Sequence, residues 1–419
     1  MRNRILVLLS VAMASPAPAQ IGPGQIGQAL PGVTQPAERV LGGTLETVDR
    51  TLTSGMDATT RAARSASALA QARIDRIGDL VRRNPAVIER DADGNPARKG
   101  ELLLVAPDQP TLDAAKQLGF SFLAEERLDT LDLTVTRLSV PRGMTLARAQ
   151  ALLRKAAPDA TVAADTLNFP SGAAAAARER EGKAPLQQLP PVATPVGVID
   201  GAPGRVIPVE AVRGFAPGAP APGDHGSAVA SLLHRAGVQR VLVADVYGAG
   251  PAGGNALAIA QGVDWLMGRG VRVISISLVG PANGLLARAI GAAQRQGAMI
   301  VAAVGNDGPA APPAYPASYP GVLAVTGVDG RNRALIEAGR ALHLDYAAPG
   351  ADMRAMNAAG RLVPVRGTSF ATPLVAARAA NAMDARAALP AALDREAIDL
   401  GPRGPDAVYG RGLICTICR

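Results

Sequence analysis

Cysteine is nearly absent from this sequence, which has two among its 419 residues, Cys415 and Cys418. A fold held together by a disulfide framework is therefore excluded. Two cysteines with two residues between them can bind zinc, but a zinc site needs further ligands, and no other Cys or His lies near them in the sequence. We expect residues 415–419 to form a tail with a local disulfide or with no role, and we expect no metal site.

Aromatic residues and histidines are also few, since aromatics make up 3% of the chain and there are three His. Because 48% of the residues are hydrophobic, a sizeable core must be built mainly from Ala, Val and Leu. The 43 basic and 35 acidic residues give a net charge of +8, but the basic residues form no dense run and have almost no aromatic residues among them. We therefore expect no nucleic-acid partner.

Long hydrophobic runs are absent after the N-terminus, so we expect no integral membrane segment in the mature chain. At the N-terminus, Arg2 and Arg4 precede a short apolar run, Ile5 to Met13, and Ala17-Pro18-Ala19 provides a small-residue cleavage site. This pattern is typical of a signal peptide over residues 1–19. It predicts a secreted or periplasmic protein, because the leader fits both locations.

The next three segments differ in composition. Residues 20–100 combine a flexible lead-in, rich in Gly, Pro, Ala and Gln, with an amphipathic helix from about Asp57 to Arg83. Residues 101–170 follow the order strand, helix, strand, strand, helix, strand, which predicts a small α+β unit of the ferredoxin-like type. Residues 171–191 have the composition of an exposed linker that proteases cut easily.

From residue 192 to residue 414, short apolar runs alternate with helical patterns, and the first run is Val196 to Ile199. Strands that alternate with helices predict an α/β domain with a doubly wound, mostly parallel sheet. In such sheets the chemically active residues lie at the carboxyl ends of the strands.

Four residues of this domain have surroundings that suggest chemistry, although each has an ordinary explanation as a turn, cap or structural residue. Asp200 closes the first apolar run, and Asn306 follows another such run. His225 lies in Gly-Asp-His-Gly-Ser-Ala-Val-Ala, where a loop enters a helix. Ser369 lies in Arg-Gly-Thr-Ser-Phe-Ala-Thr-Pro at the start of another helix, where backbone N–H groups stabilise developing negative charge.

The order Asp, His, Ser and the segments around these residues resemble the three signatures of the subtilase family. The resemblance covers about residues 192–414 and is most specific at Gly-Thr-Ser-x-Ala-Thr-Pro. It implies that Ser369 is the nucleophile, that His225 is the general base oriented by Asp200, and that Asn306 donates to the oxyanion. It also implies a set of substrate-binding residues, namely Ser277, Leu278, Val279, Gly280, Ala303 and Gly305.

From this resemblance we expect a secreted serine endopeptidase that acts on proteins or peptides. The α+β unit then corresponds to an inhibitory propeptide, so the chain is a precursor that processes itself and binds its own N-terminal unit. The chemistry requires no cofactor. Structural calcium is compatible with the family, but the sequence has no convincing acidic calcium loop.

The sequence departs from the family at two places. Gly201-Ala202 follow Asp200 where the family has Thr or Ser and then Gly, which predicts the loss of a local hydrogen bond. Val279 stands where the family has a glycine, and its branched side chain predicts a narrow cleft that favours small substrate side chains.

The first departure leaves a second hypothesis open, an inactive protein of the subtilase fold that binds peptides or serves as a scaffold. A third, a nucleotide-binding protein, has only Gly201-Ala202-Pro203-Gly204 in its favour, and this segment lacks the Gly-x-Gly-x-x-Gly spacing.

Overall fold

The computed structural model describes residues 65–171, 173–174 and 189–418. The expected signal peptide and most of the expected lead-in lie outside the described residues. The expected amphipathic helix is present from residue 65, where the description begins, to residue 83. No described helix is both long enough and apolar enough to span a membrane.

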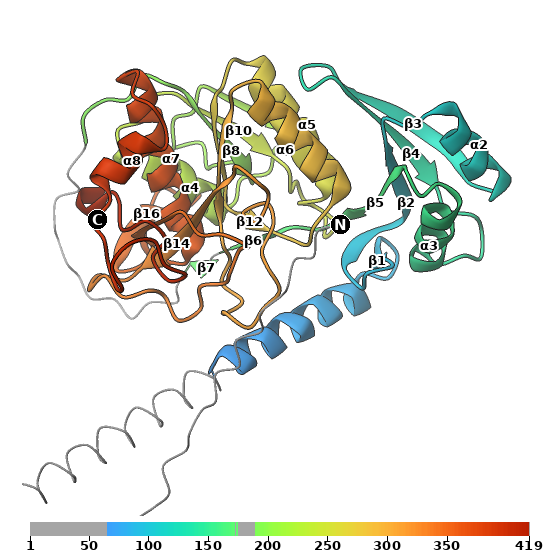
Figure 1. Ribbon diagram of the computed structural model, residues 1–419, viewed down its shortest axis with the longest axis horizontal. Coiled ribbons are helices and arrows are strands. Elements are labelled where there is room, and N and C mark those ends of the chain that lie inside the picture. The colour runs from blue at the N-terminus through green and yellow to red at the C-terminus, as the bar shows by residue number, and fades with distance from the viewer. Residues whose placement is uncertain (1–64, 172, 175–188, 419) are drawn as a thin grey trace, which may run out of the picture. The chain divides into compact units, whose positions relative to one another are not determined.

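The α+β unit follows this helix and has the element order that the sequence predicts, with one addition at its start (Figure 1). The strands are ordered β1-β2-β4-β3, with β5 also paired to β2, and every pair is antiparallel. The side chains of Asp108 and Thr145 cap its two helices by accepting backbone N–H groups of the first turn. The elements are β1 (Ile88–Arg90), β2 (Pro96–Val105), α2 (Gln109–Gln117), β3 (Ser121–Leu128), β4 (Leu133–Ser139), α3 (Leu146–Ala156) and β5 (Thr161–Thr166).

The addition is β1, which forms a hairpin with the first part of β2, so the unit starts at residue 88 rather than at residue 101. In β1 only Ile88 is buried, so no apolar run indicates this strand in the sequence. Its turn is held by Asp91, whose carboxylate accepts the N–H groups of Asp93 and Asn95. Gly94 completes the turn with a φ of 80°, a backbone conformation that favours glycine.

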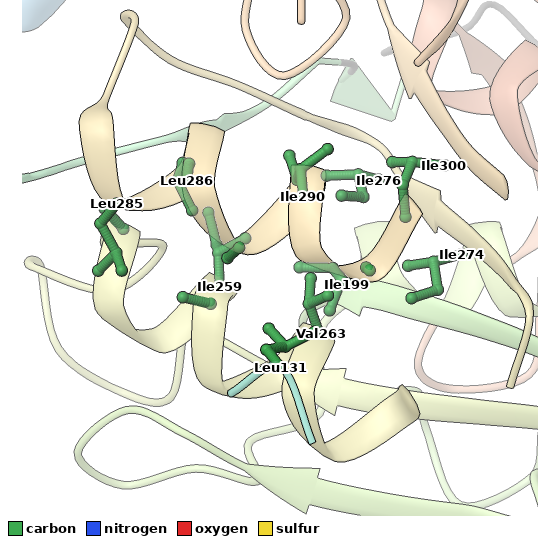
Figure 2. Close-up of a cluster of buried hydrophobic side chains, with 14 of the residues drawn as sticks. Leu131, Ile199, Ile259, Val263, Ile274, Ile276, Leu285, Leu286, Ile290 and Ile300 are labelled. Atoms are coloured by element: carbon green, nitrogen blue, oxygen red, sulfur yellow. The ribbon is translucent and has the colours of Figure 1, made fainter. Parts of the chain in front are cut away.

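Strand β2 is buried on both faces, and this joins the α+β unit to the later part of the chain. Leu102 and Leu104 pack with residues of α2 and α3, whereas Leu103 and Val105 point to the opposite face. There they join Leu131 in a second cluster, which Figure 2 shows between α5 (Ala256–Gly268), α6 (Gly284–Arg295) and the main sheet.

The main sheet has seven strands in the order β15-β14-β13-β11-β8-β10-β9, and all its pairs are parallel. The predicted doubly wound α/β fold is confirmed. The isoleucines of β8 and β11 face α5 and α6, whereas the valines of the same two strands face α4 (Asp224–Arg235) and α7 (Thr368–Asp384). The strands are β8 (Val196–Asp200), β9 (Ala211–Gly214), β10 (Val241–Asp245), β11 (Val273–Ile276), β13 (Met299–Ala303), β14 (Leu323–Val328) and β15 (Tyr346–Pro349).

Two strands differ from the pattern in the sequence. β9 has exposed side chains because it is the edge strand of the sheet and pairs with β10 alone, so its residues form no apolar run. The sequence predicts one strand over residues 271–278, but the structure has β11 and a separate strand, β12 (Leu278–Val279). β12 leaves the main sheet and pairs with β6 (Phe169–Pro170), which comes from the end of the α+β unit.

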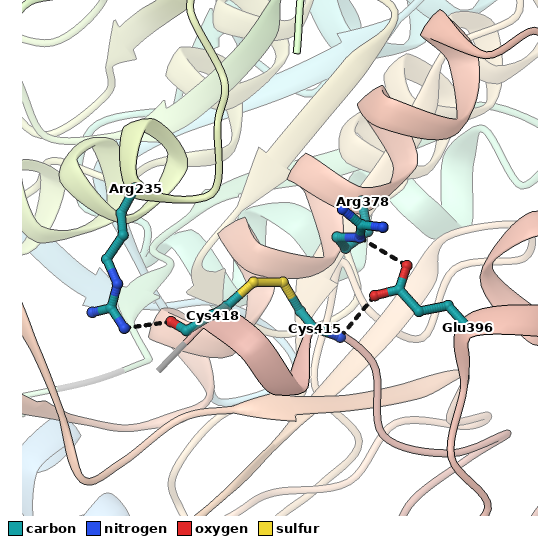
Figure 3. The surroundings of a disulfide bond; sticks show 5 residues. All are labelled: Arg235, Arg378, Glu396, Cys415 and Cys418. Atoms are coloured by element: carbon teal, nitrogen blue, oxygen red, sulfur yellow. Dashed lines mark hydrogen bonds and ion pairs between the residues drawn. A yellow bond between two sulfur atoms is a disulfide. The ribbon is translucent and has the colours of Figure 1, made fainter. Parts of the chain in front are cut away.

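The end of the chain is packed into the protein rather than extended as a tail. Cys415 and Cys418 form a disulfide, and both are buried in the cluster around α7. Figure 3 shows that Arg235 of α4 donates to the Cys418 carbonyl at 2.6 Å. Glu396 of α8 (Ala391–Glu396) accepts both from the N–H of Cys415 and from Arg378 of α7.

Proline 373 lies inside α7 and leaves one helical carbonyl without its usual partner. A proline has no N–H, so Pro373 cannot donate to the carbonyl of Ser369 four residues earlier. The hydroxyl of Ser277, which lies between β11 and β12, donates to this carbonyl at 2.9 Å. The bond ties the first turn of α7 to the segment that the sequence identified as substrate-binding.

A buried carboxyl lies where the α+β unit contacts α5. Asp165 of β5 is fully buried, and its Oδ1 accepts the N–H of Leu257 in the first turn of α5 at 2.9 Å. Its Oδ2 has no hydrogen-bond partner in the described part of the chain, and the nearest cation, Arg98, lies 3.9 Å away. Burial raises the pKa of Asp165 to about 6, because the charged form loses its hydration.

We predict that Asp165→Asn stabilises the uncut chain in a pH-dependent manner. A carboxyl with a pKa near 6 in the fold and 3.8 outside it destabilises the fold when ionised, so the penalty is complete above pH 6 and declines as the pH falls toward 3.8. In a Ser369→Ala background, the variant should gain about 3 kcal/mol or less at pH 8 and lose most of this gain at pH 4. Calorimetric unfolding at the two pH values measures the difference, and an equal gain at both contradicts it.

We also predict that Ser277→Ala destabilises the chain, because the Ser369 carbonyl is then buried without a partner. The cost should be about 1–3 kcal/mol in the free energy of unfolding, measured by denaturant titration in the Ser369→Ala background. Ser275 provides the matched control, since it is equally buried and its hydroxyl has no partner among the described residues. Equal losses for Ser277→Ala and Ser275→Ala would show that the bond contributes nothing.

Candidate active site

Asp200 and His225 form a hydrogen-bonded pair at the carboxyl edge of the main sheet. Asp200 is the last residue of β8 and is buried, and His225 is the second residue of α4. The His225 Nδ1 donates to Asp200 Oδ2 at 2.8 Å and lies 3.0 Å from Oδ1. Asp200 Oδ1 also accepts the N–H of Gly201 at 2.7 Å, so the carboxylate is fixed from two sides. This arrangement fixes the orientation of the ring.

The glycine after His225 has a steric role that explains part of the motif. A Cβ atom at Gly226 would lie 2.0 Å from the carbonyl oxygen of Gly201. Any side chain there would therefore push the first turn of α4 away from the loop that follows Asp200. The close approach that Gly226 permits brings His225 within reach of Asp200.

Ser369 lies in the first turn of α7 and is completely buried. Its Oγ is 2.8 Å from the Oγ of Ser171 and donates to the carbonyl of Ser277 at 3.3 Å. It is not hydrogen-bonded to His225, whose Nε2 has no partner within the described residues. The structure thus joins Asp200 to His225 and places Ser369 in a different hydrogen-bond network.

Asn306 follows β13, and its side chain is oriented by α7. The N–H of Thr368 donates to Asn306 Oδ1 at 3.0 Å, which leaves the amide nitrogen, Nδ2, facing the other way. Nδ2 donates to the carbonyl oxygen of Ser171, and the N–H of Ser369 donates to the same oxygen at 3.1 Å. Two N–H donors therefore converge on one peptide carbonyl next to the Ser369 hydroxyl.

The residues before Ser171 lie in the cleft as an extended strand. Leu278 and Val279 pair antiparallel with Pro170 and Phe169, and the N–H of Ser171 donates to the carbonyl of Ser277 at 3.1 Å. After the site, β7 (Ala173–Ala174) pairs with β17 (Leu362–Arg366). The segment that the sequence identifies as a linker therefore starts within the cleft, bound by peptidase-domain strands on both sides of Ser171.

Two further residues contact this strand and were missed in the sequence. The carbonyl of Gly254 accepts the N–H of Asn168 at 2.8 Å, and the Tyr247 hydroxyl donates to the carbonyl of Asn168 at 3.0 Å. Burial, and then the charges of Asp200 and Asp245, raise the pKa of Tyr247, so its hydroxyl stays protonated. The glycines that follow β10 were the available signal, because they lie at the carboxyl end of a strand.

Of the remaining expected substrate-binding residues, Gly280 lies directly against this strand. Gly280 allows close approach, because a Cβ there would be 2.1 Å from Asn168 Oδ1. Gly305 lies against Val279, and Ala303 is the buried last residue of β13. Among residues 65–171 and 189–418, no group of three or more His, Cys, Asp or Glu is placed to hold a metal ion.

Comparisons with known proteins identify the family of this domain. Residues 216–411, a range that contains His225, Asn306 and Ser369, match the model of the subtilase family. Subtilisin Savinase of Lederbergia lenta is 34% identical over 179 residues, which are 40% of this chain and 66% of the relative. The minor extracellular protease Epr of Bacillus subtilis (strain 168) is 30% identical over 167 residues, which are 38% of this chain and 26% of the relative.

Among solved structures, fervidolysin from Fervidobacterium pennivorans, described as a keratinolytic enzyme related to subtilisin, superposes with a TM-score of 0.63. The match has 17% sequence identity and covers 78% of this chain and 61% of fervidolysin, so it shows a shared fold. The fold, the matched range and the sequence relatives lead to one assignment. Residues 216–411 of the chain form a domain of the subtilase family, whose sequence relatives here are subtilisin-like serine proteases.

Proposed function

We propose that this protein is a serine endopeptidase that is made as a self-processing precursor. The observation that carries the proposal is the peptide carbonyl of Ser171, which accepts hydrogen bonds from Asn306 Nδ2 and from the Ser369 N–H beside the Ser369 hydroxyl. Donors that converge on a carbonyl oxygen next to a hydroxyl nucleophile stabilise the oxyanion of acyl transfer.

The residues supply each step of peptide hydrolysis. Ser369 Oγ attacks the carbonyl carbon, and its proton passes to His225 Nε2 while Asp200 stabilises the imidazolium. Asn306 and the Ser369 N–H hold the negative oxygen of the tetrahedral intermediate. The carbon–nitrogen bond then breaks, and His225 gives its proton to the leaving nitrogen. Water hydrolyses the resulting ester by the same route, and Ser369 regains its proton. No step requires a cofactor or a metal ion.

The N-terminal α+β unit acts as the inhibitory propeptide in this proposal. The residues that follow its strand β5, up to Ser171, occupy the cleft, so the uncut chain cannot admit another peptide there. Residues 1–19 direct export to the periplasm or the medium, and protein or peptide substrates are then met outside the cytoplasm. The name of one relative includes the word extracellular, which is consistent with this location.

One observation favours a second candidate function, an inactive peptide-binding or scaffold protein. The Ser369 hydroxyl is hydrogen-bonded to the Ser171 hydroxyl and the Ser277 carbonyl rather than to His225, so the nucleophile is not activated in this conformation. Rotation about the Cα–Cβ bond of Ser369 is needed before His225 can take its proton. A protein in which this rotation never occurs binds peptides without cutting them.

We predict that a fluorophosphonate probe labels the purified wild-type protein and leaves the Ser369→Ala variant unlabelled. The wild type should also lose its N-terminal unit, whereas Ser369→Ala should retain it, which intact-mass measurement distinguishes. If the wild type stays unlabelled after another protease has removed the N-terminal unit, the inactive peptide-binding function replaces the proposal.

We also predict that Asn306→Ala slows release of the N-terminal unit by about 10²–10³-fold, a magnitude measured for the oxyanion Asn of subtilisin itself. The Asn306→Asp variant separates the donor from the shape of the side chain. It keeps an oxygen for the Thr368 N–H but has no Nδ2 donor, so it should be at least as slow as Asn306→Ala. A normal rate for Asn306→Asp would mean that the amide donor has no part in the reaction.

A further inference from the structure

We infer that the chain cuts itself after Ser171 and that Val279 restricts the cleavage site to bonds that follow small side chains. This inference rests on the proposed peptidase function and identifies both its first substrate and the residue that sets its specificity.

The carbonyl of Ser171 is the one that is placed for attack by Ser369. Ser171 is the residue whose oxygen receives both oxyanion donors, and its own N–H donates to Ser277 at 3.1 Å. Strand pairing fixes the chain on each side, through Phe169–Pro170 before the site and Ala173–Ala174 after it. The carbonyl of Ser171 is therefore held in one register, because a slip by one residue would break the pairing of both flanking strands.

The Ser171 side chain has little free space around it. Ser171 is 2% exposed, and its hydroxyl lies 3.1 Å from the carbonyl of Ser277 and 2.8 Å from Ser369 Oγ. Val279 lies against Gly305, which follows β13. A Cβ on Gly305 would lie 3.3 Å and 3.6 Å from the two Val279 methyl carbons. The Val279 side chain therefore already lies close to the backbone of Gly305.

A cavity of about 230 Å³ lies beyond this contact. Val279 and Gly305 both line it, with Tyr315 and Phe169 among the other lining residues, but Ser171 does not. The cavity has room for a large side chain. Val279 pairs with Phe169, so its side chain lies on the same face of the strand pair as that of Ser171 two residues later. We infer that the Val279 methyl groups form a barrier between the Ser171 side chain and the cavity. Glycine at position 279 would remove the two methyl groups that form this barrier.

The Ser171 side chain also contacts the nucleophile, Ser369. The Ser171 hydroxyl is hydrogen-bonded to Ser369 Oγ, so the substrate itself contributes to holding the nucleophile away from His225. This bond must break before attack. Alanine at position 171 keeps the small size and removes the bond, so it should be cut at least as fast as serine.

The chemical step is balanced by groups already in the site. Ser369 Oγ forms an ester with the Ser171 carbonyl carbon, and the bond from that carbon to the nitrogen of residue 172 breaks. The Ser369 proton reaches that nitrogen through His225. One water molecule then attacks the ester. Its oxygen joins the Ser171 carbonyl carbon to form the new carboxyl group, and one of its protons returns to Ser369 through His225.

The test follows self-cleavage of the full-length chain by intact-mass spectrometry. Early fragments of the wild type should divide after Ser171, so that the large fragment begins at Gly172. Ser171→Phe should slow this cut by about 100-fold or more, whereas Ser171→Ala should keep the wild-type rate or exceed it. Adding Val279→Gly to Ser171→Phe should restore the cut after residue 171 to within about tenfold of the wild type.

A second measurement does not depend on folding of the Ser171→Phe precursor. Mature wild-type enzyme should prefer peptides with Ala or Ser before the cut to those with Phe by about 100-fold, and the Val279→Gly enzyme should lose this preference. Fluorophosphonate labelling of Ser369 together with a first cut at another bond would overturn the inference and leave the peptidase function intact. Equal rates for Ala and Phe peptides in the wild type would overturn the role of Val279. Absence of labelling in every variant would remove the proposed function itself.

Discussion

The packing of α7 against the centre of the main sheet sets the position of Ser369, and the rest of the site depends on it. The helix packs against β8, β11, β13, β14 and β15, and alanine is the most frequent of its buried residues, with a small side chain that allows close approach. Its first turn then meets the ends of β11 and β13. From there Ser277 donates to the Ser369 carbonyl, and Asn306 accepts the Thr368 N–H. One helix end thus aligns Ser369, Asn306 and the strand that pairs with residues 169–170.

The N-terminal unit and the peptidase domain share one hydrophobic cluster, and this contact delivers the chain to the site. Leu131 packs with α5 and α6, and Asp165 and Asn283 make hydrogen bonds across the same contact. β5 ends at Thr166, so residues 167–171 leave this contact and reach the cleft within a few positions. If the proposed self-cleavage occurs, this segment is covalently tethered and already strand-paired, so little orientational freedom is left to lose before reaction.

The sequence predicted the parallel sheet because apolar runs mark the buried strands. It indicated Asp200, His225, Asn306 and Ser369 as candidates through the resemblance of the segments around them to a family, since each of these residues has an ordinary explanation when taken alone. The contents of the cleft were not predictable in this way, because Ser171 meets Ser369 across 198 positions and its own segment reads as a linker. β1 and β9 were missed because a short or edge strand has no apolar run. The burial of Cys415 and Cys418 was not predictable from the sequence, because it results from tertiary packing around α7.

The single tryptophan of the chain, Trp265, lies on the helix that receives the N-terminal unit. Residues four before and three after it share its helix face. Gln261 donates to Glu126 of that unit, and Gly268 lies so close to Thr130 that a Cβ there would be 2.9 Å from its hydroxyl. Trp265 is half-buried on this face, and its ring lies 6.0 Å from that of Phe215. Under the proposed function, release of the unit would change the surroundings of this helix face, and the fluorescence of the indole would report it without an added dye.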